Sequence, residues 1–504
     1  MIKSNKFSRR NIKKFIVDYF SDYRHNLILL LTDSYKVTQY LQYPENTDFI
    51  YSYIESRGGE FKKSVVFGLQ GWIKEYLIDN PITMDMINDA ADILDPHGFE
   101  KFNRKGWEDI VNNHNGQMPI RIRAVPEGTV IDVKNVIATV INTHPDFYWL
   151  TSYIETAILR AIWYGTTVAS NDFEIKNTIR KYMMDTTMLI GDELELDLMY
   201  RLHDFGGRGV SSTESAGIGG CAHLVNFAGT DTLPALLYAK KYYGAYDAGH
   251  SIDASEHSTI TSWTRSREIN AYENMINKFA GQGKTFACVS DSYDIFEAIR
   301  MWGTLKDKLI EKGGRLVIRP DSGLPAKIVL QCLELMEEVF GMSVNERGYK
   351  VLPDYVRLIQ GDGINRGSIK EILETFTSAG YSAENVFFGM GGAMLQKVDR
   401  DTMKFAMKCS AAFISGEWVD VFKDPITDPG KTSKKGIISL FRDLNGDEYS
   451  SRIRNISCDY DNSDELDIIW ENGIFYSETD LETVRGNAIA GYNKIKLDKQ
   501  KLAA

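Results

Sequence analysis

The chain contains little cysteine, and its few cysteines follow no pattern. Five are scattered over 504 residues, none lies in a CxxC pair, and their odd number argues against a disulfide framework. The missing pairs also argue against a structural zinc site, which needs clustered ligands. We therefore expect reduced thiols in a cytoplasmic protein.

Long apolar runs are absent as well. No stretch approaches the length that crosses a bilayer, so we expect no membrane partner. Residues 1–30 form a basic N-terminal extension without the apolar core and small-residue cleavage site of a secretion signal. We interpret this extension as a docked or frayed segment.

The chain also has no excess of basic charge. Lysine and arginine number 58 against 69 aspartates and glutamates, a net charge of −11. This balance argues against nucleic acid as a partner, although it permits a local basic pocket for phosphates. The length is too great for one simple core and predicts two or three domains.

Segments toward both ends of the chain have the rhythm of β-structure. Residues 49–145 are β-prone, and the alternation around the Pro-Glu-Gly turn at 126–128 predicts a hairpin. Helical spacing follows over residues 147–188. The Asn-Gly pairs at 445–446 and 472–473 predict two more hairpins. We therefore expect a flanking β-rich α+β domain built from both chain termini.

The middle of the chain repeats a different unit. Between about residues 200 and 400, an apolar strand, a polar turn and a helix follow one another four times. The four predicted strands and their turns cover residues 286–293, 315–323, 356–363 and 384–394. This alternation predicts an α/β fold with a parallel sheet, and a (β/α) barrel is the expected closure.

Two of the intervening helices have specific expected features. Apolar spacing predicts one continuous helix over residues 294–310. The helix after the third strand carries a capping-box pattern from Ser368 to Glu371, which predicts its first turn there.

Polar residues follow each of the four predicted strands. The strand ends carry Asp291, Asp321, Asp362 and the glycine turn Gly389–Gly392. One aspartate in such a place is commonly a helix N-cap. Three in phase with a glycine turn are hard to explain by capping, and strand ends are where barrels of this kind carry their chemistry. We therefore predict one shared site.

The residue types suggest what this site binds. A glycine-rich turn before a helix lets backbone N–H groups approach a phosphate, and Arg400 downstream fits a monophosphate pocket. Asp362 can accept hydrogen bonds from sugar hydroxyls. Asp291 and Asp321 can hold a hydroxyl or water-coordinated Mg²⁺, which prefers oxygen ligands.

Two histidines upstream are further candidates. His203 lies in HDFGGRGVSS (203–212) and His257 in SEHSTIT (255–261). A lone histidine is more often structural than catalytic, but each of these lies among other polar residues in a short predicted turn.

Segments over most of the chain resemble the nicotinamide phosphoribosyltransferase family. They run in order from residue 32 to about 440: TDSYKVTQYLQYP, HDFGGRGVSS, GTDT, EHSTIT, VSDSYDI, IRPDSG, IQGDG, GGAMLQK and VFKDP. Several of these segments are longer than chance allows. The first 30 residues and the last 50 or so are less informative.

The resemblance implies an enzyme, a pentosyltransferase of NAD salvage. The family transfers a phosphoribosyl group from phosphoribosyl pyrophosphate to nicotinamide with Mg²⁺, giving nicotinamide mononucleotide and pyrophosphate. It also implies ATP as an activating co-substrate and a homodimer of irregular α/β barrels whose active sites lie at the subunit interface. The corresponding domains are the extension 1–30, a flanking domain over 31–165 and 401–504, and a barrel over 166–400.

The resemblance assigns the base-binding residues. Phe205 stacks on one face of the nicotinamide ring, and the partner subunit's Tyr35 lies on the other. Asp231 accepts a hydrogen bond from the carboxamide N–H. Arg319 borders the base pocket, and His203 is a further substrate-binding candidate.

The resemblance also assigns residues to the phosphoribosyl group. Asp291 and Asp321 organise the ribose and metal region, the metal being held through water. His257 corresponds to a histidine that ATP phosphorylates. The ribose hydroxyls and 5′-phosphate are assigned to Gly361, Asp362, Gly391, Gly392 and Arg400. The pyrophosphate is assigned to Arg208, joined by Arg57 of the partner subunit, Lys408 of the partner subunit and Lys423 of the partner subunit.

Three positions depart from the vertebrate-like pattern. Gly207 replaces a tyrosine, Met390 a serine and Phe387 an alanine. Because Phe387 is bulky and near the expected exit tunnel, we expect it to narrow that tunnel.

Three other functions compete with this interpretation. Nicotinate phosphoribosyltransferase shares the architecture, but an aspartate such as Asp231 accepts an amide N–H and repels a carboxylate. A non-catalytic binding protein would show an eroded site, whereas every charged position is filled. A phosphosugar aldolase would need a Schiff-base lysine, and the four strand ends carry none.

Overall fold

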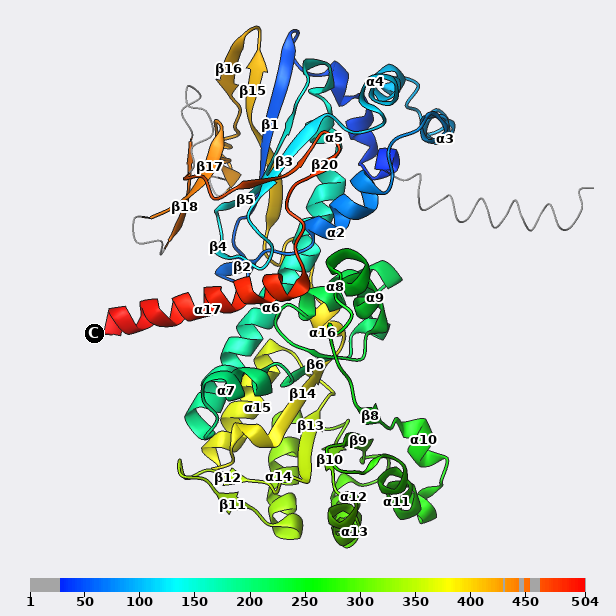
Figure 1. Ribbon diagram of the computed structural model, residues 1–504, viewed down its shortest axis with the longest axis vertical. Helices are drawn as coiled ribbons and strands as arrows, with labels where there is room; N and C mark the ends of the chain where they lie inside the picture. The colour runs from blue at the N-terminus through cyan, green and yellow to red at the C-terminus, as the bar shows by residue number, and fades with distance from the viewer. Residues whose placement is uncertain (1–27, 429–430, 444–447, 454–462, 504) are drawn as a thin grey trace, which may run out of the picture. The chain divides into compact units, whose positions relative to one another are not determined.

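The computed structural model describes residues 28–428, 431–443, 448–453 and 463–503. The chain divides into two compact units (Figure 1). The flanking unit comprises residues 1–163 and 400–504, and the barrel unit comprises residues 164–399. Most of the basic extension, the Asn-Gly turn at 445–446 and Cys458 lie outside the described residues.

A seven-stranded sheet forms the centre of the flanking unit. Its strand order is β16-β15-β1-β5-β3-β19-β20, and the strand pairs within it are antiparallel. The bounds are β1 (Thr47–Ser56), β3 (Ile120–Ala124), β5 (Val136–Asn142), β15 (Phe405–Ile414), β16 (Glu417–Asp420), β19 (Asp467–Glu471) and β20 (Ile474–Phe475). The unit is thus built from both ends of the chain, because β1 pairs with β15 across more than 300 intervening residues.

Six helices complete the described part of the flanking unit, and one of them, α6, continues into the barrel unit. They are α2 (Leu69–Ile73), α3 (Met84–Leu94), α4 (Arg104–His114), α5 (Leu150–Tyr153), α6 (Glu155–Thr186) and α17 (Leu481–Ala503). The predicted helical stretch at 147–188 is therefore mainly α5 and α6. No described helix combines the length and apolar character needed to span a bilayer.

The predicted hairpin at 126–128 is wrong. β3, before the turn, pairs with β5 and β19, whereas β4 (Val130–Asp132), after it, pairs with β2 (Lys63–Val65). The turn itself docks on the chain after β2, where the Glu127 carboxylate accepts hydrogen bonds from the backbone N–H groups of Gly68 and Gln70 at 3.0 and 2.9 Å. This tertiary contact separates the two strands that local alternation would pair.

The Asn-Gly pair at 472–473 forms the hairpin that the sequence predicts. β19 and β20 pair antiparallel, with Trp470 opposite Phe475. Asn472 and Gly473 have positive φ of 50° and 92°, as the tight turn between two twisted strands requires. β17 (Ile438–Arg442) and β18 (Tyr449–Ile453) also pair antiparallel, on either side of the undescribed turn.

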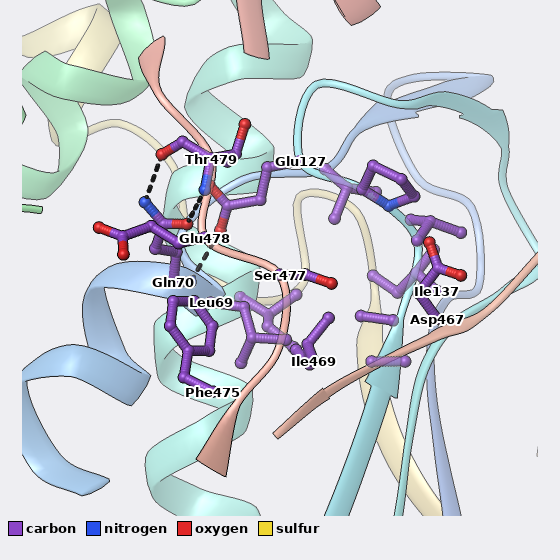
Figure 2. A pocket seen from close by; sticks show the side chains of 16 residues that line it. Leu69, Gln70, Glu127, Ile137, Asp467, Ile469, Phe475, Ser477, Glu478 and Thr479 are labelled. Carbon is purple, nitrogen blue, oxygen red and sulfur yellow. Dashed lines mark hydrogen bonds between the residues drawn. The ribbon is translucent and has the colours of Figure 1, made fainter. Parts of the chain in front are cut away.

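The flanking unit also encloses a cavity of about 280 Å³ (Figure 2). Its lining is largely apolar, and the segment after β20 closes one side. There Gln70 and the Thr479 backbone exchange two hydrogen bonds of 2.8 and 2.9 Å. None of the predicted site residues lines this cavity.

A curled parallel sheet of seven strands forms the barrel unit. The order is β7-β6-β14-β13-β10-β9-β8, and every strand pair is parallel. The bounds are β6 (Leu202–Asp204), β7 (Gly229–Thr230), β8 (Asp253–Ala254), β9 (Thr285–Val289), β10 (Arg315–Arg319), β13 (Val356–Gln360) and β14 (Val386–Met390). A parallel bridge joins Gly229 of β7 to His250, just before β8, and so links the two edges of the sheet. This agrees with the predicted irregular barrel.

Helices follow most of these strands, as a parallel sheet requires (Figure 1). They are α8 (Thr213–His223), α9 (Leu233–Tyr243), α10 (His257–Thr261), α11 (Glu268–Phe279), α12 (Ile295–Thr304), α13 (Lys306–Lys312), α14 (Pro325–Phe340), α15 (Arg366–Ser378) and α16 (Gly392–Leu395). The continuous helix predicted over 294–310 is wrong, because it is interrupted at Leu305 between α12 and α13.

The predicted capping box is displaced by one turn. Helix α15 is capped by Asn365, whose side chain accepts hydrogen bonds from the N–H groups of Gly367 and Ser368. Ser368 is the third helical residue, and its hydroxyl oxygen accepts a hydrogen bond from the Asn365 N–H at 2.9 Å. Asparagine is at least as good a cap as serine, so the earlier polar residue begins the helix.

Candidate active site

Three predicted catalytic side chains meet at neighbouring strand ends of the barrel unit. His257 begins α10 after β8, Asp291 follows β9, and Asp321 follows β10. The His257 Nε2 lies 3.6 Å from Asp291 Oδ1 and 3.5 Å from Asp321 Oδ2. The three candidates singled out from separate motifs therefore share one rim, with the His257 ring within reach of both carboxylates.

Only one carboxylate oxygen of Asp291 accepts hydrogen bonds from the described residues. Its Oδ2 accepts hydrogen bonds from the Asp321 backbone N–H at 2.9 Å and the Ser322 hydroxyl at 2.6 Å. Its Oδ1 is buried and lacks a hydrogen-bond partner within the described part of the chain. A buried carboxylate oxygen in this state favours a ligand that brings a hydroxyl, a water or a cation.

Asp321 has a perturbed acidity. Burial raises the pKa of Asp321, with Asp291 and Asp362 acting in the same direction and Arg319 and His257 opposing them. The Arg319 Nε lies 4.0 Å from Asp321 Oδ1 and is itself buried without a hydrogen bond inside the described ranges. The two charges therefore satisfy each other poorly, which leaves both available to a ligand.

The Phe205 ring occupies the mouth of the barrel, and a glycine makes room for it. Phe205 follows β6, and its N–H donates to the Met390 carbonyl at 2.9 Å. A Cβ added at Gly389 would lie 1.9 Å from the Phe205 ring, and one added at Gly361 would lie 3.4 Å from it. Gly389 therefore provides the space in which the aromatic ring lies.

Asp231 lies beside the Phe205 segment, at the end of β7. Its backbone N–H donates to the carbonyl of Asp204 at 2.9 Å, and its exposed carboxylate accepts a hydrogen bond from the Ser251 hydroxyl. Burial lowers the pKa of His203 to about 4, so the imidazole is neutral at physiological pH. Because His203 is a residue of β6, the prediction that it belongs to a turn is wrong.

The phosphate and ribose candidates surround the same rim. Gly391 caps the short helix α16, which begins at Gly392. The loop that carries Arg208 packs against this turn, since a Cβ added at Gly209 would lie 3.0 Å from the Gly392 Cα. Arg208 and Asp362 are exposed at their strand ends. The assignments of these residues to phosphate and sugar remain predictions.

The flanking unit contains the remaining cationic candidates. Arg57 follows β1, Lys408 lies on β15, and Lys423 follows β16. Burial lowers the pKa of Lys408, and the positive charges of Arg57, Lys423 and Lys36 lower it further, against the opposing effect of Glu155. Such a gathering of like charges is costly unless an anion joins it, which favours a phosphate or pyrophosphate ligand.

Sequence reasoning missed Lys36 in this cationic group. Lys36 is 4% exposed, and its Nζ contacts Glu155 at 2.7 Å. The sequence feature that could have identified Lys36 is its position directly after Tyr35 in the TDSYK segment. The Tyr35 side chain is 60% exposed. Arg400, the predicted phosphate-binding residue, forms an ion pair with Asp401 at 2.9 Å.

Phe387 belongs to a small apolar cluster of the barrel unit. It packs with Ala287, Val317 and Ile359, residues of the three neighbouring strands, and the Arg201 guanidinium lies 4.3 Å from its ring centroid. We expect Phe387→Ala to strengthen binding of an extended, tunnel-spanning inhibitor by about tenfold, because burying about two more methylene groups of the inhibitor contributes about 1.6 kcal/mol. Isothermal titration with one such inhibitor on both forms measures this, and equal affinities would contradict the narrowed tunnel.

The described residues contain no group of three or more His, Cys, Asp or Glu side chains arranged to hold a metal ion by themselves. The donor set at the rim is two carboxylates, one of which has a buried oxygen without a hydrogen bond in the described part of the chain. This set fits Mg²⁺, which keeps several waters and commonly shares its coordination with substrate phosphates.

The chain belongs to the nicotinate phosphoribosyltransferase (NAPRTase) family. Residues 200–462, more than half of the chain, match the family as a whole. Residues 27–122 match the N-terminal domain of nicotinamide phosphoribosyltransferase. The chain is 52% identical over 467 residues to the nicotinamide phosphoribosyltransferase of Xanthomonas campestris pv. campestris, covering 92% of this chain and 98% of that one.

More distant proteins agree with this assignment. The nicotinamide phosphoribosyltransferase of Acinetobacter baylyi is 31% identical over 490 residues, covering 90% of this chain and 95% of that one. The crystal structure of the nicotinate-nucleotide pyrophosphorylase from Pyrococcus furiosus matches with a TM-score of 0.59 at 16% identity, over 94% and 97% of the two chains. Human nicotinic acid phosphoribosyltransferase matches with a TM-score of 0.58 at 14% identity, over 92% and 94%. These two structures show the fold alone.

Proposed function

We propose that the chain transfers the phosphoribosyl group of phosphoribosyl pyrophosphate to nicotinamide, forming nicotinamide mononucleotide and pyrophosphate. The observation that carries this choice of base is Asp231, whose exposed carboxylate is anchored by Ser251 beside the Phe205 segment. A carboxylate has about four lone-pair sites, so the Ser251 hydrogen bond leaves room for an amide N–H. The same carboxylate would repel the carboxylate of nicotinate.

The chemistry requires positioning and charge stabilisation more than proton transfer. Breaking the bond between C1 of the ribose and pyrophosphate leaves positive charge on the sugar, which the carboxylates of Asp291 and Asp321 favour. The ring nitrogen of nicotinamide is already a nucleophile and needs no general base. Orientation of this nitrogen by Phe205 and Asp231 supplies much of the remaining acceleration.

A metal ion fits this scheme at the Asp291 and Asp321 carboxylates. Mg²⁺ held there through water would stabilise the negative charge of the leaving pyrophosphate. Arg208 at the rim carries a guanidinium suited to the same anion. These assignments rest on the donor types and on the family resemblance.

The cationic group of the flanking unit is proposed to serve the neighbouring subunit of a homodimer. Its members are Arg57, Lys408 and Lys423, which the resemblance assigns to the pyrophosphate of the partner's site. The electrostatic strain among these residues supports an anionic ligand. Exposure of Tyr35 supports its proposed stacking on nicotinamide bound by another copy.

ATP is proposed as an activating co-substrate through His257. Phosphorylation of that imidazole would place a strong anion within reach of the rim, and its Nε2 already faces Asp291 and Asp321 at 3.6 and 3.5 Å. Chromatography of reactions with and without ATP, on the wild type and His257→Ala, tests this step. An equal ATP effect on both forms would contradict it.

Asp231→Ala is expected to reduce kcat/KM for nicotinamide by at least about 100-fold, because a polar substrate amide would face a site without its acceptor. The variant should lose discrimination against nicotinate at the same time. Initial rates with each base at equal concentration, with phosphoribosyl pyrophosphate and Mg²⁺, measure both effects. A wild-type preference for nicotinate would refute the proposed substrate, and absence of pyrophosphate release with either base would favour a non-catalytic protein.

A further inference from the structure

A buried histidine–aspartate pair lies behind the base-binding residues and has no part in the chemistry above. It consists of His223, the last residue of α8, and Asp172 in α6, both 0% exposed. The His223 Nδ1 lies 2.7 Å from Asp172 Oδ2, and the His223 Nε2 lies 2.9 Å from the carbonyl oxygen of Gly229. Both ring nitrogens are therefore engaged.

These two contacts determine the protonation of the imidazole. A carbonyl oxygen only accepts hydrogen bonds, so the Nε2 must carry a proton and donate it to Gly229. Asp172 lies on the opposite nitrogen, where a carboxylate sets the orientation and tautomer of a histidine ring. The Phe227 ring is stacked on the imidazole with centroids 5.3 Å apart and planes inclined by 16°, which prevents the ring from rotating away.

The carbonyl that His223 binds belongs to the strand that presents Asp231. Gly229 and Thr230 form the whole of β7, and Asp231 is the next residue. A Cβ at Gly229 would lie 2.6 Å from the His203 ring, so the strand is wedged between the two histidines. β7 has two strand residues. Backbone hydrogen bonds hold it on both sides, from the Thr230 N–H to His250 and from the Asp231 N–H to Asp204, and the His223 donor adds a side-chain contact to the Gly229 carbonyl.

The loop from α8 to β7 is attached to α6 at further points. The Asn226 side chain donates to the Ala169 carbonyl at 2.9 Å, and the Lys176 Nζ donates to the Asn226 carbonyl at 2.7 Å. These contacts hold the loop itself, whereas the His223 side chain contacts the strand that precedes Asp231.

We propose that His223, oriented by Asp172, is a positioning residue for nicotinamide, which sets the place of Asp231 through a hydrogen bond to the Gly229 carbonyl. This inference rests on the proposed function, since it concerns the base that Asp231 binds. The donor to Gly229, rather than a net charge, does the positioning.

His223→Leu removes the donor at similar side-chain volume. We expect the KM for nicotinamide to rise about tenfold or more, with a change in the KM for phosphoribosyl pyrophosphate of less than about threefold. Asp172→Asn should stay within about threefold of the wild type for both substrates, because the asparagine amide can donate to Nδ1 and leave the Nε2 proton on Gly229.

Asn385→Leu provides a stability-matched control. Asn385 is also 0% exposed, and its side chain bonds the backbone of Leu352 and Lys350, before β14 and away from the strand ends. Asn385→Leu should lower Tm, as His223→Leu should. It should not raise the KM for nicotinamide more than the KM for phosphoribosyl pyrophosphate. Steady-state kinetics and thermal unfolding on the full chain measure all four forms.

Each outcome of this experiment decides the question. Equal shifts of both KM values in His223→Leu, or the same separation in Asn385→Leu, would overturn the proposal and leave His223 a structural residue. A loss in Asp172→Asn as large as in His223→Leu would overturn the conclusion that the hydrogen-bond donor, rather than the charge of the pair, does the positioning. If the wild type makes no nicotinamide mononucleotide, the proposed function fails instead, which the wild-type assay alone reveals.

Discussion

Asp321→Asn is expected to lower kcat by at least about 100-fold and to raise Tm at neutral pH. The loss of rate follows from the proposed mechanism, in which the Asp321 charge stabilises the electron-poor ribose. Its size is that of deleting one preorganised electrostatic contact. The higher Tm follows from the pKa of Asp321, which burial raises. Because the folded state binds this proton more tightly than the unfolded chain does, ionisation at neutral pH lowers the free energy of unfolding.

The same pKa shift predicts the acid limb of the pH profile. As the pH falls, Asp321 takes up its proton earlier than an ordinary aspartate, so kcat/KM should begin to fall above the usual carboxyl range. This protonation does not lower the free energy of unfolding, because a carboxyl group whose pKa is raised in the folded state destabilises that state only when it is ionised. Activity should therefore fall on acidification before stability does.

Asp185→Asn serves as the control for Asp321→Asn. Asp185 is an exposed residue of α6, and its replacement should change neither kcat nor Tm appreciably. Rate measurements between about pH 5 and 8, together with calorimetry at the same pH values, cover both effects. A full rate in Asp321→Asn would exclude the carboxylate from the chemistry, and a lowered Tm would contradict the inferred cost of its charge.

Gly389→Ala is expected to raise the KM for nicotinamide at least about tenfold. The new Cβ would lie 1.9 Å from the Phe205 ring, closer than atoms approach, so the ring must leave its place at the mouth of the barrel. Displacing an aromatic ring from a stacking position costs about 0.5–1.5 kcal/mol beyond the lost contact area. Overpacking a filled site adds about 1–3 kcal/mol of strain, so Tm should fall as well.

Gly281→Ala is the matched glycine control in the same unit. A Cβ there meets only the Lys284 side chain at 3.5 Å, an ordinary contact, and neither rate nor Tm should change. Titration with nicotinamide at saturating phosphoribosyl pyrophosphate separates the two variants. If Gly389→Ala binds nicotinamide with wild-type KM, Phe205 cannot be the residue that stacks on the base.

Much of the barrel could be predicted because its longer strands carry strong local signals. The segments containing β9, β10, β13 and β14 each pair an apolar run with a polar turn, and their aspartates were correctly expected at one edge. The two-residue strands β7 and β8 and the three-residue β6 were not predicted as strands. Their pairing depends on neighbours far away in the chain, and two or three residues cannot show a period of two.

The same reason explains the wrong hairpin and the displaced cap. Around residues 126–128 the alternation is genuine, but Glu127 satisfies backbone donors at Gly68 and Gln70, a contact invisible to local sequence. At α15, two polar residues compete to cap, and Asn365 outcompetes Ser368. In both cases the local pattern allows more than one answer, and tertiary contacts select among them.

The sequence by itself determined the fold class, the family and the residue types along the rim, because strand length, glycine turns and charged residue types are local properties. The tertiary structure decided which of these residues meet. It brought His257 between Asp291 and Asp321, left one oxygen of Asp291 unpartnered, and placed the buried His223–Asp172 pair behind Asp231. Distances between side chains on separate strands depend on how the sheet curls and on what is buried beneath it, and no local pattern encodes either.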